Sequence, residues 1–491
     1  MVETSHTIES QSNQVNQNPI PSPKWWAMLG IGMGVLMFAL DVYIVNIALP
    51  IIVKSLHTNF ATIQWVILSY LLILTVMVLG AGRLGDMWNK KWLYISGLIV
   101  FSISSLLCGL APTVGFLIAF RVFQGLGAVF MSALGPAIIT EVFPKEERGR
   151  ALGIIGGVFL LGIALGPTVG GLLISVGSWR LIFLVNVPLG IIASLIVALV
   201  VPASAAKETK SFDTLGAMMM TITLTCFAVG MTWGQHQGFN SPQTLILLVL
   251  AAMALACFLV VETRVTNPML DLKLFNNLEL SLGLLLSSMA YVVIASVIFI
   301  LPFFLELVKD YPTQEVGLLL AVSPMIAGVM APISGTLSDR FGPRIISLIG
   351  LFLMASGCLA ISTFDTELTV WGFIIRILPY GLGLGMFISP NNSAVLGTAS
   401  QDQLGVASGL LSLSRTLGQS VGLPVVGALF STIAIASTGF SANMDITNAP
   451  VEALVAAVQI TFRIAAPLVM ISAIIAAFLW WRSQNKEKIS S

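Results

Sequence analysis

Fourteen long apolar stretches follow one another along this chain of 491 residues. Each holds about 20 mostly apolar residues, the length that a helix needs to cross the hydrocarbon core of a bilayer. Only 9% of the residues are charged, against roughly 25% in a soluble domain. The stretches also lack the period-2 alternation of a membrane β-barrel, so we expect an all-α polytopic membrane protein with 14 transmembrane helices. The predicted spans are roughly 26–48, 62–81, 92–111, 114–136, 150–173, 180–201, 214–233, 243–261, 279–307, 314–335, 345–363, 369–390, 405–432 and 457–481.

The basic residues gather on one side of this expected bundle. An even number of spans places both termini on the same side of the membrane. With the N-terminus inside, 16 of the 23 Lys and Arg residues fall in cytoplasmic segments, three fall in external segments and four lie within spans. Cytoplasmic segments of membrane proteins carry such an excess. We therefore expect a multi-pass protein of the cell inner (plasma) membrane with its N- and C-termini in the cytoplasm.

Three pairs of similar stretches lie at a nearly constant separation. GRLGDMWNKK (82–91) matches GTLSDRFGPR (335–344) at an offset of 253, and Arg121 with its following GLG matches Arg376 with its own GLG at 255. LGIALG (161–166) matches LGQSVG (417–422) at 256. Spans 1–6 and 9–14 are therefore interpreted as two copies of a six-helix unit, with spans 7 and 8 inserted. Two such halves form a transporter architecture whose substrate site lies between them.

This repeat defines the expected domains. Residues 1–24 form a disordered cytoplasmic tail and 25–205 the N-terminal six-helix bundle. Two inserted helices with their linkers occupy 206–275, and the C-terminal six-helix bundle occupies 276–482. Residues 483–491 form a second cytoplasmic tail.

Several motifs resemble those of the major facilitator superfamily, and more closely its 14-span drug:proton antiporter branch, the EmrB/QacA type. The resemblance covers nearly the whole chain after residue 24, and it implies the major facilitator fold of two six-helix halves plus two inserted helices. The motifs that carry it are the loop signature GRLGDMWNKK, the fourth-span motif LIAFRVFQGLGA (117–128), the fifth-span motif LGPTVGG (165–171), the first-span motif LDVYIVNIALP (40–50), WRLIFLVNVPLG (179–190) and FDTLG (212–216).

The loop signature implies a conformational latch at cytoplasmic helix ends. Its residues here are Gly82 and Asp86 in the first copy and Gly335, Asp339 and Arg340 in the second. A carboxylate at such a place can pair with a basic residue or cap a neighbouring helix, which favours one arrangement of the helices. The first copy departs from the pattern, because Met87 and Asn89 stand where a basic residue and a glycine are common. A generic positively charged loop is the alternative reading.

The fifth span carries a smooth face. Gly162, Gly166 and Gly170 recur every four residues, which allows close contact with a neighbouring helix. Pro167 leaves the carbonyl of residue 163 without its helical partner and can kink the helix. The resemblance implies that this antiporter motif seals the two halves against leak, while ordinary tight packing would require the same face.

Asp41 and Arg121 are charged residues within apolar spans. Such residues are costly and almost always face a partner or a wet cavity. The resemblance implies that spans 1 and 4 line a central cavity and that the fourth-span arginine takes part in proton coupling. A neighbouring arginine stabilises the charged carboxylate and desolvation stabilises the neutral one, so Asp41 could bind and release a proton. Alternatively, Asp41 is a permanently ionised structural partner of Arg121.

Three further charged residues are candidates for the cavity. Arg376 and Arg415 could line it in the second half. Glu306 lies near the external end of span 9, where it is either interfacial or a second acidic site.

The expected function is a proton-coupled antiporter that exports amphipathic small molecules by alternating access. A proton symporter or uniporter of a polar metabolite is the alternative, and a membrane receptor or scaffold that lost transport is a remote one. The sequence holds no Walker loop, HExxH or GxSxG motif, so we expect no enzyme.

The expected partners follow from this function. They are a small amphipathic substrate and membrane lipids, with a periplasmic adaptor protein as a further partner that this branch allows. The net charge of +1 gives no reason to expect nucleic acid. The proton is the coupling ion, and we expect no other cofactor and no metal, because the histidines lie outside the spans and no cysteines form a CxxC. We expect a monomer.

Overall fold

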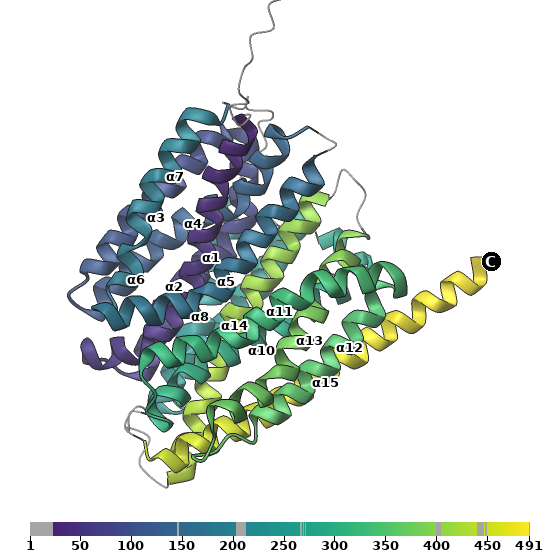
Figure 1. Ribbon diagram of the computed structural model, residues 1–491. Coiled ribbons are helices and arrows are strands. Elements are labelled where there is room, and N and C mark those ends of the chain that lie inside the picture. Colours follow the sequence, from purple (N-terminus) through teal and green to yellow (C-terminus); the bar gives the residue numbers. More distant parts are fainter. Residues whose placement is uncertain are drawn as a thin grey trace, which may run out of the picture.

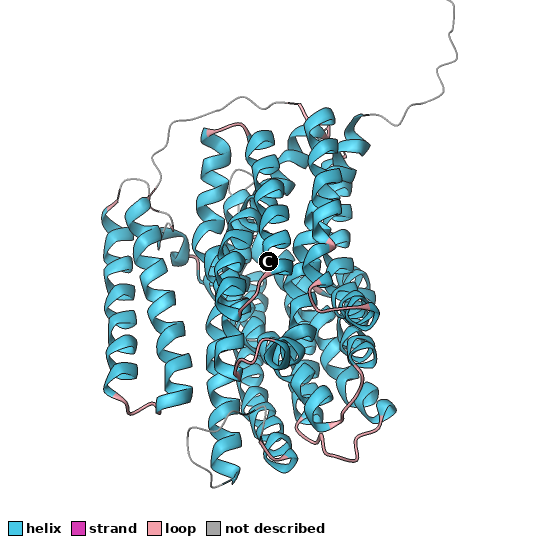
Figure 2. Ribbon diagram, turned by 90° about the vertical axis from the view of Figure 1, so that its left-hand side faces the viewer, coloured by secondary structure: helices cyan, strands magenta, loops and turns pink. Residues whose placement is uncertain are grey.

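The computed structural model describes residues 23–144, 147–202, 213–265, 268, 270, 272–398, 404–438, 446 and 449–490, and within these ranges every regular element is a helix. Figure 2 shows this all-helical arrangement. The helices are α1 (Pro23–Ser55), α2 (Phe60–Met87), α3 (Lys90–Leu110), α4 (Val114–Val142), α5 (Arg148–Val176), α6 (Leu181–Leu184), α7 (Asn186–Val200), α8 (Thr214–Gln237), α9 (Pro242–Arg264), η1 (Leu272–Asn276), α10 (Leu278–Phe303), η2 (Phe304–Val308), α11 (Thr313–Phe341), α12 (Pro343–Ile361), α13 (Val370–Leu396), α14 (Leu404–Thr438) and α15 (Val451–Ser490).

Fourteen of these helical segments are long and apolar enough to cross a membrane, which confirms the predicted number of spans. The predicted span 180–201 is built from α6 and α7 with a break between them. Pro188 contributes to that break, because it has no N–H to donate to the carbonyl of Leu184. The last helix is longer than predicted, since α15 continues to Ser490. Of the predicted first tail, 1–24, residues 1–22 lie outside the described residues, and residues 23 and 24 belong to α1.

The repeat read from the sequence reappears as repeated packing. Gly162 and Gly166 of α5 lie against the backbone of α1, while Gly418 and Gly422 of α14 lie against the backbone of α10. Small residues of this kind let helix backbones approach closely. Figure 1 shows the first half in purple and blue and the second half in green and yellow, with α14 lying beside the first half.

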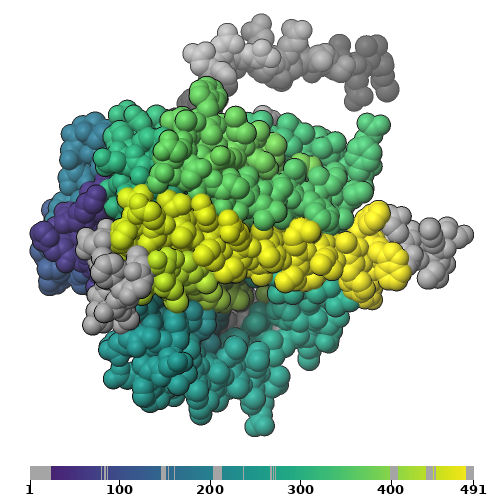
Figure 3. Space-filling view, turned by 90° about the horizontal axis from the view of Figure 1, so that it is seen from below, coloured from purple at the N-terminus to yellow at the C-terminus, as the bar shows by residue number. Residues whose placement is uncertain are grey.

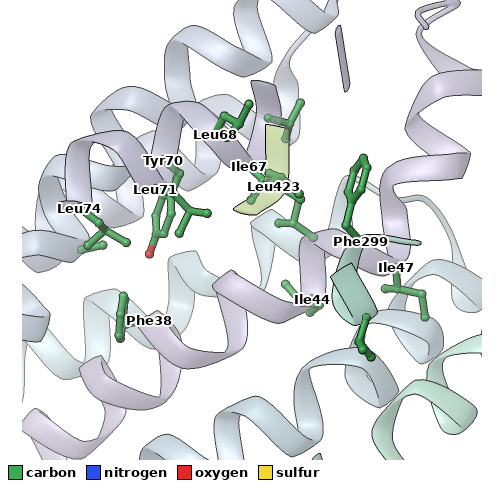
Figure 4. Packing of buried hydrophobic residues seen from close by; sticks show 14 of the residues in the cluster. Phe38, Ile44, Ile47, Ile67, Leu68, Tyr70, Leu71, Leu74, Phe299 and Leu423 are labelled. Carbon is green, nitrogen blue, oxygen red and sulfur yellow. The ribbon is translucent and has the colours of Figure 1, made fainter. Parts of the chain in front are cut away.

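The hydrophobic core runs through both halves. Figure 4 shows side chains of α1 and α2 meeting Phe299 of α10 and Leu423 of α14, and all of them belong to one buried cluster. On the outside, α15 packs on α12 and crosses the face seen in Figure 3, where it is drawn in yellow beside the green helices of the second half. The inserted helices dock through α8, where Gln235 Oε1 accepts a 2.9 Å hydrogen bond from Gln64 Nε2 of α2.

The two halves meet at one end of the bundle. We call the end where α1 begins and α15 ends the termini side, and the other end the opposite side. On the opposite side, Phe60 at the start of α2 packs on Phe299 and Phe303 of α10. The backbones of α5 and α11 also touch there, because a Cβ on Gly317 would overlap the Pro167 carbonyl oxygen. Nearer the middle, Thr75 Oγ1 of α2 and Ser420 Oγ of α14 are 2.9 Å apart.

Among the described residues, the ion pairs on the termini side stay within one half. They are Lys24–Glu147, Lys90–Glu141 and Arg344–Glu279, at N–O distances of 2.7, 2.8 and 2.5 Å. On the opposite side, the pair between Lys54 of α1 and Glu306 of η2 joins the two halves at 3.5 Å. The described contacts therefore hold the halves together on the opposite side.

Candidate functional site

Asp41 of α1 and Arg121 of α4 form a buried ion pair. Arg121 Nη1 donates to Asp41 Oδ2 at 2.5 Å, and the two residues are 0% and 1% exposed. Arg121 is the partner that the sequence suggested for Asp41, and the structure brings the two together. Their role in proton coupling stays a prediction.

Both residues belong to a network of hydrogen bonds that reaches three other helices. Asp41 Oδ1 accepts hydrogen bonds from Gln124 Nε2 at 2.8 Å and from Asn186 Nδ2 of α7 at 3.4 Å. Gln124 Nε2 also donates to Ser105 Oγ of α3 at 2.8 Å, and Gln124 Oε1 accepts from Arg121 Nη1 at 2.7 Å. The Nε of Arg121 donates to the Val66 carbonyl of α2 at 2.8 Å. The pair is thus the centre of a network that ties together five helices of the first half.

Sequence reasoning missed the neutral members of this network. A signal was present for Gln124, because it lies three residues after Arg121 and so on the same helix face. Asn186 lies within the quoted stretch WRLIFLVNVPLG, but nothing in that stretch shows which way its amide points. The side chain of Ser105 is equally buried.

Aromatic rings complete the surroundings of Arg121. Its guanidinium carbon lies 4.2 Å from the centroid of the Tyr70 ring and 5.9 Å from that of Phe183. Such rings stabilise a desolvated guanidinium through their electron-rich faces. A proton that binds Asp41 must therefore displace or weaken a contact in a tightly partnered network, and breaking a buried pair of this kind costs about 3–5 kcal/mol. A cost of that size is enough to shift a protein between two conformations.

Two of the three further cavity candidates lie on the opposite side, and their place in a substrate cavity stays a prediction. Arg376 Nη1 donates to the carbonyl of Thr363, just beyond the end of α12 on the opposite side, at 3.2 Å. Glu306 lies in the π-helical turn η2, and its carboxylate pairs with Lys54 of α1 where the halves meet. A role as a second acidic site stays a prediction.

Arg415 of α14 is the candidate that lies between the halves. Its guanidinium carbon is 4.9 Å from the ring centroid of Phe159 on α5. The side chain is partly exposed. It thus reaches from the second half to the first.

The residues of the expected latch are only partly described. Gly82 and Asp86 lie near the end of α2, but the surroundings of Gly82 and the side chain of Asp86 are outside the described part of the structure. In the second copy, a Cβ on Gly335 would lie 4.0 Å from Ser389 Oγ of α13. Asp339 is exposed and forms no ion pair with any described residue, and Arg340 lies over its neighbour Phe341 at 5.3 Å.

The glycines of the fifth-span motif pack closely, as both readings of the motif require. A Cβ on Gly162 would lie 2.5 Å from Ala39 Cβ, and one on Gly166 or Gly170 would lie 2.9 or 2.8 Å from side chains of α1. This face therefore binds α1 within the same half. The contact with the other half uses the Pro167 carbonyl, which faces Gly317 of α11.

Comparison with known proteins identifies the family. The family model described as Major Facilitator Superfamily matches residues 31–423 and 280–491. The riboflavin transporter RibZ of Clostridioides difficile is 32% identical over 83% of this chain and 88% of its own length. The tetracenomycin C resistance and export protein of Streptomyces glaucescens is 33% identical over 83% of this chain and 76% of its own length.

Solved structures of transporters share the fold. A bacterial homologue of the human lysosomal transporter Spinster, solved in an inward-facing and unoccupied conformation, superposes with a TM-score of 0.64 and 17% identity, over 93% of this chain and 97% of that one. That match shows a shared fold. With 14 spans and export proteins among its relatives, the chain belongs to the major facilitator superfamily, in the 14-span drug-efflux branch.

Proposed function

We propose that this chain is a proton-coupled antiporter that exports amphipathic small molecules by alternating access. The observation that carries the proposal is the buried Asp41–Arg121 pair, the centre of a polar network inside a membrane-spanning bundle. A relative whose name describes resistance and export supports the direction of transport.

The excess of basic residues on the termini side supports a cytoplasmic location for that side and for both termini. The halves then meet at the external side, and the described conformation corresponds to a state that opens toward the cytoplasm. In this state substrate would enter from the cytoplasm or the inner leaflet of the cell membrane. Since one chain contains both halves, a monomer would suffice, and a periplasmic adaptor stays a prediction.

The proton step follows from the partners of Asp41. In the described state its two carboxylate oxygens are occupied by Arg121, Gln124 and Asn186. When the halves open to the outside, a proton that binds one carboxylate oxygen would remove the negative charge that holds Arg121. Return to the described state restores the pair and releases that proton to the cytoplasm. Substrate moves outward in the same cycle, so the inward proton gradient drives export.

A second candidate is proton-coupled uptake of a planar polar metabolite. The relative named a riboflavin transporter favours it. In the antiport candidate the proton and the substrate cross the membrane in opposite directions. In the uptake candidate they cross it in the same direction.

Proton flux in reconstituted vesicles separates the candidates. The protein is placed in vesicles with an acidified interior and a pH-sensitive dye, and either ethidium or riboflavin is added outside. Antiport predicts substrate-dependent proton efflux that Asp41→Asn abolishes, whereas uptake by symport predicts proton entry with the substrate. Asp365→Asn, in the connection between α12 and α13, is the matched control and should behave as the unmodified protein. Full coupling in Asp41→Asn would sink the proposal.

A further inference from the structure

Arg415 and Phe159 are equivalent residues of the two halves that meet each other. The offset of 256 that aligns LGIALG with LGQSVG also aligns residue 159 with residue 415. Their side chains lie 4.9 Å apart, guanidinium carbon to ring centroid. The repeat therefore places a cation of the second half against an aromatic ring of the first, between α14 and α5.

The charge of Arg415 is not balanced by a neighbouring carboxylate. Among the described residues it takes part in none of the ion pairs, whereas Asp41 pairs with Arg121 and Glu306 with Lys54. A charged side chain within a membrane span is costly unless it finds a partner or water. Since Arg415 is partly exposed, a molecule that enters between the halves can supply the missing negative charge.

Three tyrosines lie within electrostatic range of this cation. They are Tyr43 of α1, Tyr70 of α2 and Tyr291 of α10. Gln419, one turn further along α14, lies next to Tyr43. The surroundings thus combine flat ring faces with hydroxyl donors, contributed by helices of both halves.

Two buried hydroxyls of this group have no hydrogen-bond partner among the described residues. One is the hydroxyl of Tyr70, a residue that is 0% exposed. The other belongs to Tyr380 of α13, which is 1% exposed and lies in the neighbourhood of Tyr43 and Tyr291. A buried polar group without a partner is unfavourable, so these hydroxyls are ready to donate to an acceptor.

We propose that the chain binds the carboxylate of a flat aromatic substrate at a site that we call the Arg415 subsite. The subsite consists of Arg415, Phe159 and four tyrosines, Tyr43, Tyr70, Tyr291 and Tyr380. The guanidinium can hold a carboxylate through two parallel hydrogen bonds, and the tyrosine hydroxyls supply further donors. The Phe159 ring packs against the aromatic body. The inference rests on the proposed function, because it names the substrate class of that transport site as anionic and aromatic. A fixed cation would be repelled by Arg415.

A pair of probes that differ only in charge tests this. Binding of 2-naphthoate and 2-naphthamide to the purified protein is measured by their fluorescence. A charge-assisted hydrogen bond predicts that the carboxylate binds about tenfold more tightly than the amide, or better. Arg415→Gln should lower the affinity for the carboxylate to that for the amide and leave the affinity for the amide within about twofold, which also reports that the variant is folded. Arg415→Lys should keep part of the preference, because it retains the charge and loses the paired geometry.

Arg463→Gln is the matched control, since Arg463 is an exposed arginine within the span of α15. It should leave both affinities unchanged. Equal affinity for the two probes in the unmodified protein overturns the inference, whatever the variants do. So does absence of carboxylate binding, or a preference that survives in Arg415→Gln.

The proton-flux assay separates this inference from the proposed function. If naphthoate is preferred but drives no proton efflux, the subsite stands and antiport fails. If naphthamide or ethidium drives proton efflux as well as naphthoate does, antiport stands and the anionic substrate class fails.

Discussion

Arg121 and Arg376 occupy corresponding places in the two halves, 255 residues apart and each followed by the same GLG. Arg121 is 1% exposed and pairs with Asp41. Arg376 is partly exposed and donates to the Thr363 carbonyl. At the offset of 255, the counterpart of Asp41 is Ser296, whose hydroxyl donates to the Val292 carbonyl. The repeat therefore fixes where an arginine lies along the helix, and a single acid decides whether it becomes part of a buried charge pair.

The contacts between the halves show the same kind of difference. Gly317 of α11 faces the Pro167 carbonyl of α5, so backbone meets backbone. In the counterpart contact, Gly427 of α14 faces the side-chain amide of Gln64 on α2. A side chain can move aside and a helix backbone cannot, so the α5–α11 contact should tolerate change less than the α2–α14 contact.

The largest expected effect is that of Asp41→Asn. It leaves the Arg121 guanidinium buried without its counter-charge, which should destabilise the protein by about 3–5 kcal/mol and abolish substrate-driven proton flux. Thermal unfolding in detergent and the vesicle assay measure the two effects. Ser296→Ala, at the counterpart position, is the control and should change the stability by about 1 kcal/mol or less. A similar loss in both variants would remove the contrast between the halves.

Next in size is Gly317→Ala. Its Cβ would overlap the Pro167 carbonyl oxygen, so the halves can no longer close fully on the opposite side. Overpacking of about 1–3 kcal/mol should shift the ratio of the two conformations roughly tenfold toward opening on that side. The shift can be followed by the distance between spin labels at Thr58 and Glu367, in a background without the four free cysteines.

Two further glycine variants serve as comparisons for Gly317→Ala. Gly427→Ala should shift the ratio less, because the Gln64 amide can move. Gly328→Ala, on the same helix as Gly317, should not shift it, because nothing lies within 4 Å of its Cβ position. Equal shifts in all three variants would show that the α5–α11 contact is not the cause of the shift.

The sequence predicted the spans and the repeat because both depend on patterns that many residues share. It also predicted the meeting of Asp41 and Arg121, since a charge in hydrocarbon must find a partner and few were available. The sequence could not show that Arg121 is paired and Arg376 is not, because both arginines precede GLG. A sequence pattern indicates how deep a residue lies along a helix, but not which side chains of other helices surround that residue. Glu306 was missed as a contact between the halves for a similar reason: the π-helical turn of η2 changes the direction in which the last turn faces.

A smaller effect is expected for Glu306→Gln. The change removes the ion pair with Lys54, which joins the halves at 3.5 Å. Because Lys54 is 63% exposed, the pair is worth about 0–1 kcal/mol. The ratio of the two conformations, followed by the spin-label distances, should shift toward opening by at most about fivefold. Added salt should reduce this difference from the unmodified protein. Glu315→Gln, an exposed acid in the first turn of α11, should cause no shift. A shift as large as that of Gly317→Ala would mean that charge, rather than backbone contact, closes this side.

The smallest effect is expected for Arg376→Gln. The side chain gives up one hydrogen bond to a carbonyl at a partly exposed position, and water can replace it, so the cost should stay within about 1 kcal/mol. Substrate-driven proton flux should remain within about twofold of the unmodified protein. Arg121→Gln, the same substitution at the counterpart position, leaves Asp41 buried without its cation and should abolish that flux. The two variants differ only in which copy of the repeat they alter. If Arg376→Gln also abolishes proton flux, both copies take part in coupling, and the acid of the first half is not what sets them apart.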